Sequence, residues 1–326
     1  MKVGKRHCIK ILVLLLFLIV FAVLSLSLFP KPLDFSLEPV RLQHIVVKIR
    51  LPEILIAIVA GACLGLSGSI MQIILDNPLA SPFTLGISSA AACGASFSIV
   101  LNMLYGITWL HTGVVAFCFS MLSVGALVLM VSVAGISQKN IILIGMAISF
   151  FFSSANTLLE FYAPPDVLYQ ITVWTTGSLT TSNLYDSLNL FLIFSCSLMI
   201  SMLFSNDMSI LLQGEYTAIM HGVNVSLERI MFLAICSLLA SYSVSIVGII
   251  GFIGLVAPHI CRLIGLESPK LLLLSSSIMG SLLLVVADII STTAVYPLIL
   301  PISAVTSFFG IPFLLILLFA RKGVSK

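Results

Sequence analysis

Long apolar runs, separated by short polar or proline-containing breaks, fill the chain almost from end to end. A helix needs about 20 apolar residues to cross the hydrocarbon core of a bilayer, so each long run is a candidate span. The clearest runs are Ile11–Phe29, Ile54–Leu75, Leu85–Leu104, Thr112–Val133, Ile141–Leu159, Leu188–Leu203, Ile230–Ile250, Leu271–Ile290 and Ala304–Ala320. Gly251–Leu263 is a shorter candidate. The pattern therefore predicts about ten transmembrane helices.

These runs lack the strict alternation of apolar and polar residues that is typical of a membrane strand. Lipid offers no partners to exposed backbone N–H and C=O groups, so a run that spans the bilayer must be helical. The chain is 60% hydrophobic and 8% charged, whereas a soluble domain carries roughly 25% charged residues. We expect an all-α, polytopic membrane protein with a single transmembrane domain over residues 1–326, and we exclude a water-soluble fold and a β-barrel.

Positive charges are distributed unevenly between the two sides of the predicted spans. Four of the 15 Lys and Arg residues lie between the first two spans: Lys31, Arg41, Lys48 and Arg50. If the N-terminus is cytoplasmic and ten helices cross, all the others lie on the cytoplasmic side. Cytoplasmic loops carry the excess of Lys and Arg, so this topology is favoured. We expect both termini in the cytoplasm, which requires the short Gly251–Leu263 segment to cross.

Residues with catalytic or metal-binding chemistry form no cluster along the sequence. The seven cysteines occur singly, without CxxC or Cys/His ligand spacing, which is typical of small core residues. The sequence contains no G-x-x-x-x-G-K-[ST] loop to cradle the phosphates of ATP. We therefore expect a chain that is not an enzyme, has no cofactor or metal of its own and binds no nucleic acid.

The longest predicted cytoplasmic connection, residues 205–229, is too polar to span and long enough for two short helices. Five residues would supply the apolar faces of such helices: Leu211, Leu212, Ala218, Ile219 and Met220. Gly222 can end a helix in the left-handed conformation. The residues alone leave two interpretations open, which are helices lying on the membrane surface and a docking element for a cytoplasmic partner.

Several motifs follow one another in a fixed order along the chain. They are Arg50-Leu51-Pro52, Asn77-Pro78-Leu79-Ala80-Ser81-Pro82, Leu85-Gly86-Ile87-Ser88-Ser89, Gly214-Glu215 with Ala218 and Gly222-Val223-Asn224, and the segment Gly251–Arg262. On these motifs the chain, from Arg50 to its C-terminus, resembles the FecCD/BtuC-like permeases of type II ABC importers. Collinear motifs at workable spacing are a much stronger signal than an isolated short motif.

The resemblance implies a permease subunit that works with several partners. Two permeases, either two copies or one copy and a paralogue, would pair around a central path in the lipid of the plasma (inner) membrane. Two cytoplasmic ABC ATPase subunits would use ATP, and an extracytoplasmic substrate-binding protein would deliver the cargo. The family mostly handles iron chelates, so a siderophore or haem is the expected cargo, with cobalamin or molybdate as alternatives.

An ion-coupled secondary transporter is the less favoured class of function. Such a transporter should show paired broken helices and charged residues near the midplane in both halves of the chain. Neither feature is apparent in this sequence.

The resemblance also assigns roles to particular residues. The cytoplasmic loop would seat in a groove of the ATPase, which implies coupling residues Gly214, Glu215, Ala218, Gly222 and Val223. In the family the fifth helix lines the path, which here implies Ser149, Ser153, Ser154 and Asn156. Small residues also allow close helix packing, and for each single residue of this helix both interpretations remain open.

Positive residues of the outer loop are candidates for docking of the binding protein. Arg41, Lys48 and Arg50 would attract an acidic partner lobe, whereas the alternative is that they are solvated or contact lipid headgroups. The chain departs from the family at Glu53 and Thr292. Many members carry arginines at these two places, which hold acidic residues of the binding protein.

Asp288 lies near the outer end of its predicted helix. An acid within a membrane helix suggests a function such as a proton relay. We favour a structural hydrogen bond to a neighbouring helix end, because no second buried acid or base forms an obvious relay partner.

Overall fold

The computed structural model describes residues 2–28, 45–107, 109–135, 137–180, 183–295 and 297–322, with side chains over 6–27 and 45–313 of these. The described residues are almost entirely helical, which confirms the predicted all-α class; beyond helices and turns there is one isolated bridge between Val295 and Leu298. The helices are α1 (Lys2–Leu28), η1 (Val46–Arg50), α3 (Leu51–Ile74), η2 (Pro82–Leu85), α4 (Ile87–Tyr105), α5 (Thr112–Ala134), α6 (Gln138–Tyr162), α7 (Pro165–Thr175), α8 (Leu184–Leu203), α9 (Ser205–Leu211), α10 (Glu215–Met220), α11 (Val225–Val247), α12 (Ile253–Leu263), α13 (Pro269–Thr293) and α14 (Ile302–Lys322).

Eight helices of the described chain are long and apolar enough to cross a membrane: α1, η1 with α3, α4, α5, α6, α8, α11 and α13. Two shorter apolar stretches, in α12 and in the first part of α14, match the two remaining predicted spans. The predicted runs therefore coincide with helices. The count of ten crossings and the side of each terminus stay predictions.

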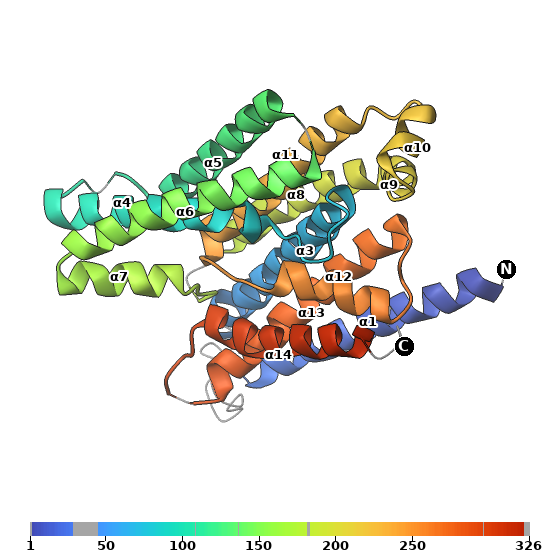
Figure 1. The fold of residues 1–326 in the computed structure, drawn as a ribbon. Helices are drawn as coiled ribbons and strands as arrows, with labels where there is room; N and C mark the ends of the chain where they lie inside the picture. The colour runs from blue at the N-terminus through green and yellow to red at the C-terminus, as the bar shows by residue number, and fades with distance from the viewer. Residues whose placement is uncertain are drawn as a thin grey trace.

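Helix α3 lies at the centre of the bundle, with α1, α13 and α14 on one side of it and α4 to α7 on the other (Figure 1). It packs against α8, α11, α12 and α13, and 89% of its most apolar window is buried. A helix that is apolar on all sides is suited to such a position, because every face meets another helix.

Glycines let the neighbours of α3 approach its backbone closely. A Cβ on Gly61 would lie 2.4 Å from the carbonyl oxygen of Gly280 in α13, and one on Gly65 would lie 2.0 Å from that of Ser276. A Cβ on Gly68 would lie 1.7 Å from the carbonyl oxygen of Gly254 in α12. Small residues are used in this way where membrane helices pack through van der Waals contact.

Side-chain hydrogen bonds near the end of α3 tie this helix to α12. The guanidinium of Arg262 donates to the side-chain oxygen of Gln72, and the Gln72 amide donates to the carbonyl of Leu255 at 3.3 Å. On the far side of the bundle, Gly177 and Gly248 pack against each other where α7 and α11 end. The motif segment Gly251–Arg262 thus lies where α12 meets α3.

Candidate coupling surface and translocation path

The predicted cytoplasmic connection folds into two short helices, α9 and α10, between α8 and α11 (Figure 1). This confirms the expectation of two helices within residues 205–229. Gly214 begins α10 with φ +115°, and Gly222 follows its end with φ +81°. Val223 donates its N–H to the carbonyl of Ala218 at 3.0 Å, which closes the helix end. The two glycines supply backbone conformations that other residues adopt at a cost.

One face of this helix pair is anchored to the start of α11. The side chains of Leu211, Ala218 and Val225 form a small buried cluster. Arg229 of α11, whose side chain is 1% exposed, donates to the carboxylate of Glu215 at 3.2 Å. A guanidinium held this deeply fixes the direction of the carboxylate it binds. Ala218 and Glu215 therefore hold α10 in place.

The opposite face of α10 is apolar and exposed. Tyr216, Ile219 and Met220 are 78%, 57% and 70% exposed, and we call them the α10 outer face. Ala218, Ile219 and Met220 were predicted to lie on apolar faces, with no distinction between inner and outer positions, and Tyr216 was not predicted. The spacing of 216, 219 and 220 is that of one helix face, which is the signal that identifies it.

The predicted path residues of α6 fall into two groups. Ser153 and Ser154 are exposed, and Ser149 is half-buried beside Gly86. The same helix exposes large apolar side chains, among them Phe150 at 73% and Phe151 at 69%. This exposed side of α6 carries both the small polar residues and the aromatic rings.

Asn156 joins α6 to α4. Its side-chain oxygen accepts a hydrogen bond from the Ser96 hydroxyl at 2.6 Å, and its amide donates to Glu160 at 2.7 Å. Ser96 is fully buried. Asn156 therefore satisfies polar groups between two helices, as the packing interpretation requires, and it is half-buried.

The three predicted docking residues have different surroundings. Arg41 lies outside the described residues, and Lys48 of η1 is exposed. Arg50 is only 3% exposed, and its guanidinium donates to the carbonyl of Leu26 in α1. The motif Arg50-Leu51-Pro52 thus directs this arginine into the helix bundle, which argues against a surface role for it.

The expectation that Asp288 has no buried acid or base as a partner was wrong. Asp288 of α13 and Glu53 of α3 are 2% and 3% exposed and interact electrostatically. Thr292, at the other departure from the family, is also buried and donates its hydroxyl to the Asp288 carbonyl at 2.9 Å. The partner was missed because residues 53 and 288 come together only through the packing of α3 on α13.

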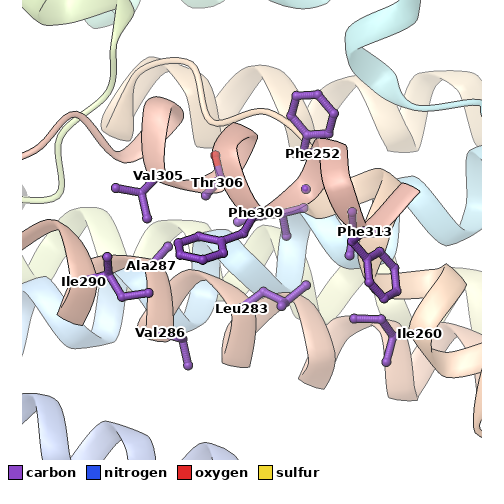
Figure 2. A pocket seen from close by; sticks show the side chains of 13 residues that line it. Phe252, Ile260, Leu283, Val286, Ala287, Ile290, Val305, Thr306, Phe309 and Phe313 are labelled. Carbon is purple, nitrogen blue, oxygen red and sulfur yellow. The ribbon is translucent and has the colours of Figure 1, made fainter. Parts of the chain in front are cut away.

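An apolar hollow of about 330 Å³ lies between α12, α13 and α14. Figure 2 shows the rings of Phe309 and Phe313 on α14 and of Phe252 before α12 around it. Among the lining residues only Thr306 has a polar side chain, and its hydroxyl donates to the carbonyl of Ser303 at 3.1 Å. This lining offers no charged group to a metal chelate.

The chain is similar to known proteins over most of its length. The FecCD transport family matches residues 11–320. A Fe(3+)-citrate import system permease protein of Bacillus subtilis (strain 168) is 34% identical over 284 residues, covering 86% of this chain and 82% of that protein. A hemin transport system permease protein of Yersinia pestis is 32% identical over 282 residues, covering 86% of this chain and 84% of that protein.

A solved structure has the same arrangement of helices. It shows a metal-chelate type ABC transporter in an inward-facing conformation, and it is 29% identical to this chain with a TM-score of 0.86. The similarity covers 95% of this chain and 99% of the solved one.

Proposed function

Because the chain belongs to the FecCD transport family, we propose that it is the permease subunit of an ABC importer that moves an iron chelate, such as a siderophore complex or haem. It is a multi-pass integral membrane protein of the plasma membrane. ATP is used by two partner ATPases, since the sequence has no phosphate-binding loop.

The observation that carries the proposal is the α9–α10 pair, which is anchored to α11 on one face and has an exposed apolar surface on the other. Arg229, Glu215 and the buried cluster fix α10 to α11. The exposed Tyr216, Ile219 and Met220 can then enter a groove of the ATPase. A fixed element transmits a push from the ATPase to α11, whereas a loose loop would absorb it.

The exposed side of α6 is the proposed wall of the path. Pairing with a second permease would bury Phe150 and Phe151. The small hydroxyl side chains of Ser149, Ser153 and Ser154 would line a passage that interacts only weakly with the cargo. A path without a metal-ligand cluster suits cargo that crosses as a complete chelate.

A substrate-binding protein is the proposed source of the cargo. Lys48 is exposed and remains a docking candidate together with Arg41. Arg50 is removed from this surface by its burial. Acidic groups on the partner would be drawn by the remaining positive charges, chiefly through the rate of association.

The test is ATP hydrolysis by the permease in nanodiscs, co-expressed with its candidate ATPase. Binding proteins loaded with ferric siderophore, haem, cobalamin or molybdate are added one at a time. We expect one of the two iron-containing ligands to change the hydrolysis rate, and cobalamin or molybdate to leave it unchanged. Stimulation by cobalamin or molybdate alone would overturn the iron assignment.

Variants at position 215 test the coupling role in the same assay. Glu215→Lys places a second positive charge beside Arg229 and should abolish uptake and weaken ATPase association. Glu215→Gln keeps an acceptor for the guanidinium and should retain most of both. Normal uptake and normal ATPase co-purification in Glu215→Lys would contradict coupling through α10.

A further inference from the structure

Two buried carboxyl groups, Glu53 in the first turn of α3 and Asp288 near the end of α13, lie at the contact between these two helices. The helix register places them there. In the antiparallel pair, Gly61 meets Gly280 and Gly65 meets Ser276, so each step forward in α3 is a step backward in α13. Glu53 lies eight residues before Gly61, and Asp288 lies eight residues after Gly280.

The surroundings of the two carboxyls come from three elements. Ser25, near the end of α1, is buried and interacts with the carboxyl of Asp288. Arg50, at the junction of η1 and α3, interacts electrostatically with Glu53 while it donates to the carbonyl of Leu26. One carboxyl oxygen on each acid, Oε1 of Glu53 and Oδ1 of Asp288, has no hydrogen-bond partner within the described part of the chain.

Among the described residues, the charges at this junction do not balance if both acids are ionised. Arg50 supplies one positive charge to two carboxylates. The other charged groups that the structure describes on the packed elements lie elsewhere. Lys48 is exposed, Asp186 at the start of α8 accepts from its own helix end at Asn183, and Arg6, Lys10 and Lys270 lie at the far ends of α1 and α13. Arg262 of α12 donates to Gln72, Arg229 of α11 binds Glu215, and Glu228 of α11 interacts with Asp207 of α9. The described side chains of α14 include no charged residue.

Two carboxylates in one buried site cannot both stay ionised at low cost, and an added proton restores neutrality. We propose that Glu53 and Asp288 hold one proton between them, so that the junction of α1, α3 and α13 is a proton-binding site that responds to pH. A metal ion is a poorer occupant, because Ca²⁺ needs six to eight oxygen ligands and no third acid, His or Cys joins the pair among the described residues.

Proton binding by the folded chain alone makes its stability depend on pH. The proposed proton stabilises the folded chain at low pH, and this stabilisation is lost when the proton leaves. Stability therefore falls as the pH rises, and it levels off once the folded pair has lost its proton. Replacing either acid by its amide leaves one carboxylate against Arg50, which is neutral without a proton.

The experiment follows the melting temperature of the full chain in nanodiscs from pH 5 to 9, for the wild type and the Glu53→Gln, Asp288→Asn and double variants. We expect the wild type to lose about 3 °C or more across this range, and each single variant to lose that dependence. The double variant, which has neither acid, should also lose that dependence. Asp166→Asn, at an exposed position of α7, is the control and should behave as the wild type.

Infrared spectroscopy of the same samples gives an independent measurement. A protonated carboxyl band should be present in the wild type at neutral pH, disappear at alkaline pH and be absent from both single variants. Equal pH responses in the wild type and the single variants, or absence of the band, would overturn the proposal. Stabilisation by added Na⁺ or Ca²⁺ without the band would also overturn it and assign the site to a cation.

Discussion

At Gly68 the missing side chain decides how closely α3 and α12 approach. Gly125 in α5 also lies within a helix, yet a Cβ there would meet nothing within 4 Å. The two positions share a residue type and a helical setting, and they differ in what a methyl group would touch. They are therefore a matched pair.

We expect Gly68→Ala to destabilise the protein by about 1–3 kcal/mol, because the new methyl group would overlap the Gly254 backbone. Gly125→Ala should be neutral or stabilising by up to about 1 kcal/mol, since alanine favours helix. Thermal unfolding in detergent compares the two. A Gly68→Ala protein as stable as Gly125→Ala would contradict the close contact of α3 and α12.

Gly222 and Gly106 both follow the end of a helix with positive φ, +81° and +67°, and neither has an atom within 4 Å of a built Cβ. A β-branched residue at such a φ is strained by roughly 1–2 kcal/mol. We expect Gly222→Val to lower uptake at least tenfold by shifting the end of α10, while Gly106→Val, after α4, retains uptake. Uptake assays at equal expression decide between them, and equal losses would indicate strain without a specific coupling role.

For several residues of the candidate site, the backbone conformation could be predicted from the sequence, whereas burial and contacts could not. Gly214 and Gly222 could be predicted as turn residues, because positive φ has a compositional signature. The burial of Arg50 could not, since a charged residue before a membrane run resembles a surface charge until its partner on α1 is known. Glu53 is a similar case, because its neighbour is 235 positions away in the sequence.

At the scale of elements, α10 combines an anchored face and a free face within six residues. Every long helix was predicted from a long apolar run, because a membrane span requires about 20 apolar residues and is easily recognised in a sequence. The 11-residue α7 was not predicted, because it is too short to span and is more polar than its neighbours. Short helices depend on tertiary packing more than on their own pattern.

The α10 outer face should be needed for ATPase binding. Tyr216→Asp and Ile219→Asp place a charge in the proposed groove, and we expect each to reduce ATPase co-purification at least tenfold while membrane insertion stays normal. Tyr185→Asp is the matched control, since Tyr185 on α8 is 79% exposed and Tyr216 is 78% exposed. Equal co-purification for Tyr216→Asp and Tyr185→Asp would contradict the docking surface.

At the scale of the whole molecule, the exposed side of α6 should become the wall of a water-filled path in the assembled transporter. In a background with the native cysteines replaced by serine, Ser153→Cys and Ser154→Cys should react with a water-soluble thiol reagent, at rates that change with bound nucleotide. Cysteine in place of Ser96, which is fully buried, is the control and should not react. Unreactive thiols at 153 and 154 would place the path elsewhere.

The central position of α3 also has a consequence for synthesis of the chain. Its main packing partner, α13, begins 195 residues after α3 ends, from Ile74 to Pro269. At about 5–20 residues per second this is a delay of roughly 10–40 s. During that time the glycine face of α3 and the Glu53 carboxyl have no native partner on α13. The nascent chain therefore depends on lipid, on earlier helices or on the insertion machinery to shelter its future core until the last fifth of the protein emerges.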